Sequence, residues 1–188
     1  MTSASVKALP KEIYVKWDLC TGCRICEIVC SSSHYNLLNS ELSRIRIHPI
    51  YPGPVSVPMI CTHCSDRPCV KVCPEKALEH DENKGIIRLV KGKCLGEKCS
   101  ICARACKGLR SGVIRFYPPE HDYALICDKC DGDPQCVKVC PTGCLKYEAK
   151  ILLPDGEYFA DPLKVIAEDL AERWAPTHTG KRIRLPGE

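Results

Sequence analysis

Apolar residues in this chain come in short groups rather than in the long periodic stretches that build a large core. Ile13–Trp17, Gly85–Val90 and Val113–Tyr117 are rich in β-branched and aromatic residues, which favours short strands. A turn or two of helix is expected after Cys26. Residues 31–60, polar first and proline-rich later, are expected to run as an extended loop. The pattern predicts a small, loop-rich α+β fold.

The C-terminal region has a different pattern. Asp161 followed by Pro162 is typical of a helix N-terminus, and the helix should end before Pro176. Apolar residues then recur on one face, at Leu163, Ile166, Ala167, Leu170, Ala171 and Trp174. This amphipathic helix either covers the protein's own core or docks on a partner, and the sequence leaves both open. We expect a flexible leader over residues 1–12, and a helix with an extended docking arm within residues 149–188.

Composition argues against a conventional hydrophobic core. The 188 residues include only 2 Phe and 2 Trp, but 15 Pro, 12 Gly and 17 Cys. Small loop-rich folds need covalent or metal cross-links for stability. The cysteines are therefore the first candidates for that role, and a metal-free chain is expected to be largely unfolded.

Sixteen of the 17 cysteines form four quartets, and three residues separate the last two cysteines in each quartet. The first quartet has the spacing C-x2-C-x2-C-x3-C, which holds a [4Fe-4S] cluster in bacterial ferredoxins. Three thiolates of a short loop can reach one cube, while the fourth, a helical turn later, can serve a neighbouring cluster. The quartets are Cys20, Cys23, Cys26 and Cys30; Cys61, Cys64, Cys69 and Cys73; Cys94, Cys99, Cys102 and Cys106; and Cys127, Cys130, Cys136 and Cys140.

Two other uses of the cysteines compete with four clusters. Disulfides would suit a small secreted protein, but residues 1–11 contain no apolar signal segment. Zinc prefers sites built from two C-x2-C pairs, which would leave the repeated three-residue gap unexplained. The quartets thus predict four [4Fe-4S] clusters, with these sixteen cysteines as iron ligands.

An internal repeat relates the second and fourth quartets. The sequence Cys69-Val-Lys-Val-Cys73-Pro recurs as Cys136-Val-Lys-Val-Cys140-Pro, so the chain reads as a duplicated pair of quartets. In this alignment Cys144 matches Ala77, which indicates a small apolar position. A fifth ligand or a reactive thiol is the alternative for Cys144.

Histidine can also ligate iron, but no histidine here has a ligand spacing. His63 lies inside the second quartet, which already has four thiolates, and it is expected at the surface or as a donor to a cluster sulfur. The remaining histidines are His34, His48, His80, His121 and His178.

The formal charge of +4 counts every cysteine as neutral. With sixteen thiolates and four oxidised cluster cores the charge becomes about −4. The basic residues beside the ligands are then interpreted as local compensation, which argues against nucleic-acid binding. They are Arg24, Arg67, Lys71, Lys93, Lys98, Arg104, Lys107, Lys129 and Lys138. No window of 18 apolar residues predicts a membrane span, so a cytoplasmic location is expected.

The chain lacks motifs for substrate chemistry. It contains no dinucleotide-binding G-x-G-x-x-G, no P-loop and no C-x3-C-x2-C run. A cluster held by four thiolates has no open iron for a substrate. The sequence therefore predicts a non-catalytic chain that carries electrons for another subunit.

The four quartets in this order, across residues 13–148, resemble the four-cluster ferredoxin-like subunits of molybdenum and tungsten oxidoreductases. The segment Cys20-Thr-Gly-Cys-Arg-x-Cys-Glu-x-x-Cys-Ser-x-x-His34 is similar to the branch that accompanies tungsten aldehyde oxidoreductases and related benzoyl-CoA reductases. The resemblance implies two fused bacterial-ferredoxin-like modules, nested so that quartets one and four form one module and quartets two and three the other.

The same resemblance implies which cysteines share a cluster. Each cluster takes three cysteines from one quartet and the fourth from its partner quartet. The sets are Cys20, Cys23, Cys26 with Cys140; Cys127, Cys130, Cys136 with Cys30; Cys61, Cys64, Cys69 with Cys106; and Cys94, Cys99, Cys102 with Cys73. The repeat alone leaves sequential pairing open.

The resemblance also implies partners. We expect a tungsten pterin catalytic subunit that oxidises aldehydes in anaerobic metabolism, and a flavin/NAD subunit or ferredoxin that receives the electrons. A molybdenum enzyme, a benzoyl-CoA reductase, a free polyferredoxin and a zinc-stapled interaction module are the alternatives. Self-association into a chain through the C-terminal arm is also left open.

Overall fold

The computed structural model describes residues 10–50, 55–109 and 113–149. The predicted C-terminal helix and arm lie outside these residues, as does most of the predicted leader. Residues 11 and 12 of that leader belong to a strand, so its expected boundary was too late. The described chain is a loop-rich α+β fold with short helices and strands, as the sequence predicts.

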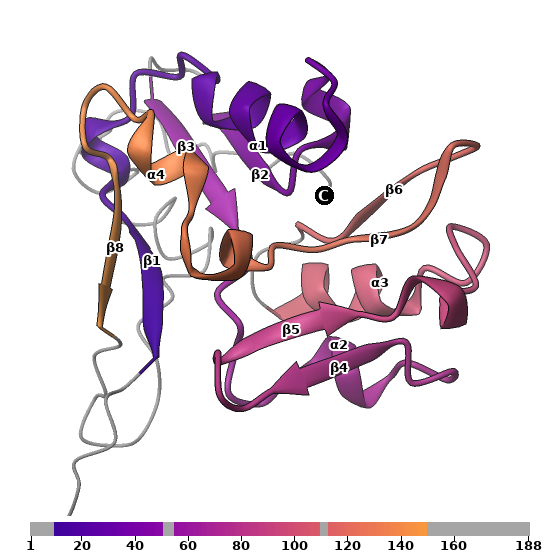
Figure 1. Ribbon diagram of the computed structural model, residues 1–188. Coiled ribbons are helices and arrows are strands. Elements are labelled where there is room, and N and C mark those ends of the chain that lie inside the picture. The colour runs from indigo at the N-terminus through magenta and orange to yellow at the C-terminus, as the bar shows by residue number, and fades with distance from the viewer. Residues whose placement is uncertain (1–9, 51–54, 110–112, 150–188) are drawn as a thin grey trace, which may run out of the picture.

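One half of the molecule combines the two ends of the described chain. Its first and last strands pair antiparallel, with Ile13 opposite Tyr147. A long helix, α1, contacts the short helix α4 and strand β2 of a hairpin (Figure 1). The elements are β1 (Lys11–Val15), α1 (Ile25–Tyr35), β2 (Ile45–Ile50), β3 (Val55–Ile60), α4 (Gln135–Lys138) and β8 (Leu145–Ala149).

The other half comes from the middle of the chain. Helices α2 and α3 contact each other, and α2 also contacts β4 of the β4–β5 hairpin, in the lower part of Figure 1. The β6–β7 hairpin extends between this half and the first. The elements are α2 (Pro68–Lys71), β4 (Leu78–Asp81), β5 (Ile86–Leu89), α3 (Ile101–Leu109), β6 (Arg115–Tyr117) and β7 (His121–Leu125). Four short 3₁₀ helices complete the described fold: Trp17–Leu19, Ser40–Leu42, Lys91–Lys93 and Lys129–Gly132.

Strands β1, β5 and β6 overlap the three segments where strands were predicted. The extended loop expected over residues 31–60 was wrong. Helix α1 continues to Tyr35, and β2 and β3 form an antiparallel hairpin. Prolines are tolerated there because each of the two strands has a partner on one side only.

The buried residues of both halves form one continuous core. Aliphatic side chains such as Ile45, Val57, Leu78 and Ile87 pack in it beside the buried cysteines of all four quartets. Among the described residues, no helix is long and apolar enough to cross a lipid bilayer.

Candidate iron-sulfur cluster sites

The loops that carry the cysteines are bent by residues in the left-handed backbone conformation. Gly22, His63 and Lys129 each precede the second cysteine of a quartet and have φ of 71°, 46° and 54°. This bend turns the backbone N–H back toward the first sulfur. The N–H of His63 donates to Cys61 Sγ over 3.5 Å, and that of Lys129 donates to Cys127 Sγ over 3.4 Å. Gly22 also faces close packing, since a Cβ there would lie 2.6 Å from Ser56 Oγ.

At one end of the molecule, the first quartet meets the last cysteine of the fourth. Cys20, Cys23, Cys26 and Cys140 line a hollow, together with Cys144. Cys140 reaches it because α4 packs against α1 and β8 pairs with β1. We call these four cysteines site I.

At the other end, the third quartet meets the last cysteine of the second. Cys73, Cys94, Cys99 and Cys102 line a second hollow, and we call them site IV. The N–H of Ala77 donates to Cys73 Sγ over 3.2 Å. The corresponding N–H in site I is that of Cys144, which hydrogen-bonds the Cys140 sulfur, so the two ends of the molecule are built alike.

Two further groups of cysteines lie between these ends. Burial raises the pKa of Cys136 to about 12, and the nearby Cys30 and Cys130 raise it further. Burial likewise raises the pKa of Cys69 to about 12, with Cys106 and Cys64 adding to the effect. We call Cys30, Cys127, Cys130 and Cys136 site II, and Cys61, Cys64, Cys69 and Cys106 site III.

Neighbouring sites are close enough for their cysteines to interact electrostatically. Cys26 of site I contributes to the raised pKa of Cys136 in site II, which is caused mainly by burial. Cys61 of site III does the same for Cys127 of site II. Cys102 of site IV does so for Cys69 of site III. Site I therefore lies near site II, site II near site III, and site III near site IV.

The chemistry of these sites suits a soft, positively charged group. None of the 17 cysteines forms a disulfide, and backbone N–H groups donate to several of the sulfurs. Such donors stabilise thiolates, yet burial raises the pKa of Cys26 to about 12 and that of Cys102 to about 11. Buried thiolates thus need compensation by bound metal, and the residues present fit iron–sulfur clusters in this respect.

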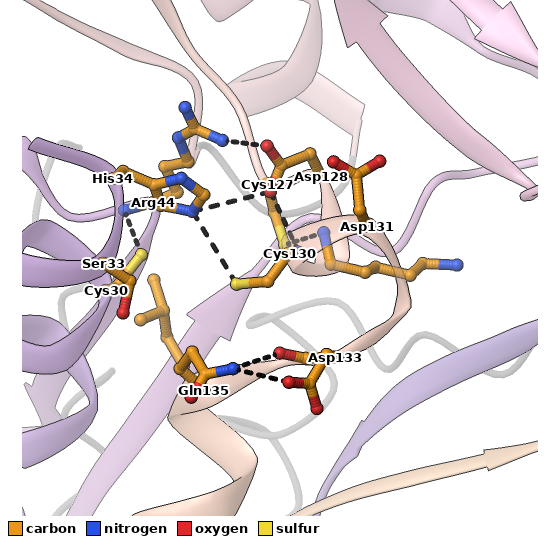
Figure 2. Close-up of polar contacts among 12 residues, drawn as sticks. Cys30, Ser33, His34, Arg44, Cys127, Asp128, Cys130, Asp131, Asp133 and Gln135 are labelled. Carbon is orange, nitrogen blue, oxygen red and sulfur yellow. Dashed lines mark hydrogen bonds and ion pairs between the residues drawn. The ribbon is translucent and has the colours of Figure 1, made fainter.

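Site II carries a polar group that the sequence did not predict (Figure 2). His34, on the last turn of α1, places Nε2 3.8 Å from Cys130 Sγ and 3.5 Å from Asp128 Oδ1. Arg44 pairs with Asp128, and its backbone N–H donates to Cys30 Sγ over 3.3 Å. Burial lowers the pKa of His34, and Arg44 lowers it further. His34 and Cys130 are 96 positions apart, so no local spacing could have revealed their contact.

His63 is not at the surface, which corrects one of its two expected roles. Its side chain is buried, and Nδ1 lies 3.8 Å from Cys61 Sγ. The same nitrogen accepts a hydrogen bond from the Ile87 N–H at 3.0 Å. His63 therefore links the second cysteine loop to β5.

Some basic residues beside the cysteines pair with carboxylates. Lys129 is only 1% exposed, and its Nζ lies 2.9 Å from Glu12 Oε1. The same Nζ also donates to the carbonyl groups of Lys11 and Gly85. At the surface, Lys138 pairs with Asp133 and Lys93 with Glu79. For these three lysines, compensation of thiolate charge is at most one part of their role.

The chain is similar to several electron-transfer proteins. It is 39% identical over 128 residues to the aliphatic sulfonate oxidoreductase, polyferredoxin-like subunit, of Pyrococcus furiosus, covering 68% of this chain and 70% of that protein. It is 33% identical to the thiosulfate reductase electron transfer subunit PhsB of Salmonella typhi, over 68% of this chain and 70% of that protein. It is 30% identical to the electron transport protein HydN of Escherichia coli, over 67% of this chain and 81% of that protein.

No family model matches the chain. Among solved structures, a chain of the active site complex BamBC of benzoyl coenzyme A reductase is 28% identical, with a TM-score of 0.43 over 89% of this chain and 93% of that one. That similarity of shape is too low to carry a conclusion.

Proposed function

The chain belongs to the polyferredoxin-like, iron–sulfur electron-transfer subunits of oxidoreductases, and on this premise we propose that it binds four [4Fe-4S] clusters as a one-electron relay. Each cluster, when bound, takes up and releases one electron at a potential set by its surroundings. The chain's own residues hold these groups in a row, surround them with hydrogen bonds and exclude water from the most deeply buried sulfurs.

The proposed ligands of each cluster are the four cysteines of one site, as defined above for sites I to IV. Sites I and II use quartets one and four, and sites III and IV use quartets two and three. The domain from residue 13 to 148 would then consist of two nested ferredoxin-like modules. The contacts of α1 with α4 and of α2 with α3 support this arrangement.

The proximity of each cysteine site to the next is the observation that carries the proposal, because the cysteines of adjacent sites interact electrostatically. In the proposed row, sites I and IV lie at the ends, each beside a hollow at the surface. A storage protein or a zinc-stapled interaction module does not need adjacent metal sites in a row. A relay does need them, because electrons must enter at one end and leave at the other.

For the partners we propose a tungsten pterin subunit that oxidises aldehydes and a flavin/NAD subunit or ferredoxin, in the cytoplasm. The tungsten partner is supported by the likeness of the first quartet to that branch. The names of the similar proteins support a partner more generally, since they are subunits of oxidoreductases acting on other substrates. The C-terminal region, residues 149–188, would dock on such a partner or on a second copy of the chain.

The experiment is the metal content of the native complex, purified without oxygen by a tag on this chain. We expect about 16 iron atoms per copy, the number for four [4Fe-4S] clusters, with tungsten in the same complex. The same iron content with molybdenum, or with no second metal, would keep the relay and overturn the choice of partner. Zinc with little iron would overturn the relay itself.

A further inference from the structure

Site II differs from its neighbour in the row by a side-chain donor brought from another part of the chain. In site III, the hydroxyl of Thr62 lies 4.0 Å from the sulfur of Cys64, the second cysteine of its quartet. In site II, the second cysteine is Cys130, and its sulfur faces the imidazole of His34 at 3.8 Å. Figure 2 shows this ring between the sulfur and the carboxylate of Asp128.

The neighbours of His34 determine which ring nitrogen carries the proton. Nε2 faces Cys130 Sγ and Asp128 Oδ1, and both are acceptors when the cysteine is a metal-bound thiolate. Nε2 must therefore carry the hydrogen, whatever the state of Nδ1. The ring is also held in place, because Arg44 pairs with Asp128 and the His34 side chain is only 15% exposed.

We propose that His34 is a positioning residue that donates an Nε2–H hydrogen bond to Cys130 Sγ and thereby raises the reduction potential of the cluster at site II. Reduction adds negative charge to the cluster and its sulfurs, so a donor to sulfur stabilises the reduced form more than the oxidised form. Because little water reaches the ring, solvent does not replace this donor when it is lost. The proposal rests on the proposed function, since it requires a cluster at site II.

The reduction potentials of the clusters along the proposed row are then unequal. Site II becomes easier to reduce than it would be without His34, so an electron rests longer there than a uniform set of potentials would allow. Asp128 and Arg44 act through His34, since they fix its ring and balance each other's charge.

The test is a redox titration of the full-length holoprotein followed by electron paramagnetic resonance, on the wild type, H34L and H34Q. In H34L we expect one of the four reduction potentials to fall by about 59 mV, which corresponds to a tenfold change in the one-electron equilibrium constant. H34Q should stay close to wild type, because its amide nitrogen reaches about as far as Nε2. His48, partly buried on β2 with no sulfur among its described contacts, supplies the control variant H48L.

Unchanged potentials in H34L, with wild-type iron content, would overturn the proposal. Equal shifts in H34L and H34Q would also overturn it, because they would indicate altered packing rather than a lost donor. If H34L loses iron, H34Q and H34N give the same comparison, since the asparagine amide is one carbon shorter. Failure of the proposed function is distinguishable, because the wild type itself would then lack about 16 irons or the cluster signals.

Discussion

Cys140 and Cys144 lie four positions apart and both line the hollow at site I, yet they have different environments. Cys144 is 2% exposed, much like Ala77 at 1%, its counterpart in the repeat. Burial raises the pKa of Cys144, and Cys20 and Cys140 raise it further, so its thiol stays neutral. The pKa of Cys140, by contrast, is lowered. Burial alone would raise it, but hydrogen bonds from the backbones of Leu145, Thr142 and Cys144 and from the Thr142 side chain outweigh the effect of burial.

We therefore predict that C140A loses iron and C144A does not. C140A should lose about four of about 16 irons, the content of one cluster. C144A should keep all of them and cost about 1 kcal/mol in unfolding free energy, as for removal of one small buried group. Iron and acid-labile sulfide analysis of the two variants checks this, and iron loss in C144A would make Cys144 a ligand.

Acid should weaken metal binding at these sites. Within this fold, it is mainly burial that raises the pKa of Cys26 and of Cys69 to about 12, and that of Cys102 to about 11. A raised pKa means that the folded protein favours the protonated thiol until the pH approaches those values, whereas iron requires the thiolate. Each thiol that regains a proton on iron release favours release about tenfold per unit fall in pH.

The expected outcome is faster and more complete iron removal by a chelator at pH 6.5 than at pH 8.5. The absorbance of the clusters in the visible range follows the reaction, and circular dichroism at both values controls for a change of fold before the chelator is added. Equal removal at the two pH values would contradict the assignment of thiolate ligands.

The cysteine quartets can be recognised in the sequence, but the side chains around them cannot. The spacing within each quartet is local and reflects how far one loop can reach around a cluster. The partners of His34 and Lys129 are set by the fold: Lys129 meets Glu12 across 117 positions of sequence. With a single sequence, only a knowledge of which quartets pair could have suggested such contacts.

At the scale of elements, the region between the first two quartets shows where proline misleads. The alternation of Ile45, Arg46, Ile47 and His48 is that of a strand, and Ile45 and Ile47 are indeed buried. Because of Pro49 and Pro58, an extended loop was predicted instead. In a hairpin of only two strands, each strand has an edge without a partner strand, and proline is tolerated on such an edge. The apolar alternation, rather than the prolines, therefore determines the structure of this segment.

Lys129 links its own 3₁₀ helix to β1 and to the residue before β5. Its Nζ donates to the carbonyl of Lys11 in β1 and to that of Gly85 before β5, and it pairs with Glu12. We predict that K129M destabilises the holoprotein by about 3–5 kcal/mol, because the buried ion pair between Lys129 and Glu12 is broken. Urea unfolding monitored by circular dichroism measures this effect.

Two controls separate charge from packing. K84M removes a surface lysine that pairs with the exposed Asp131, and it should cost less than about 1 kcal/mol. The double variant E12L/K129M removes both buried charges and should recover much of the stability lost in K129M. If K129M proves no more costly than K84M, the buried pair is not what joins these elements.

At the scale of the whole molecule, the described fold has little to hold it together without bound metal. Each of its four sheets is a single pair of strands, and an isolated pair is marginal in water. Helices α2 and α4 are one turn long, too short to form alone. Cysteines from all four quartets make up a large share of the buried core, so their occupied sites would serve as its centre.

We therefore predict that removal of iron unfolds the protein. Treatment with a chelator and reductant under anaerobic conditions should abolish most of the circular dichroism and any cooperative thermal transition, and iron with sulfide should restore both. The same chelator saturated with iron beforehand is the control, because it leaves ionic strength and reductant unchanged. A metal-free protein that still unfolds cooperatively would show that the hairpins and the aliphatic core suffice. The clusters would then bind to a fold that forms without them, and single-site variants such as C140A should lose one cluster with almost no change in stability.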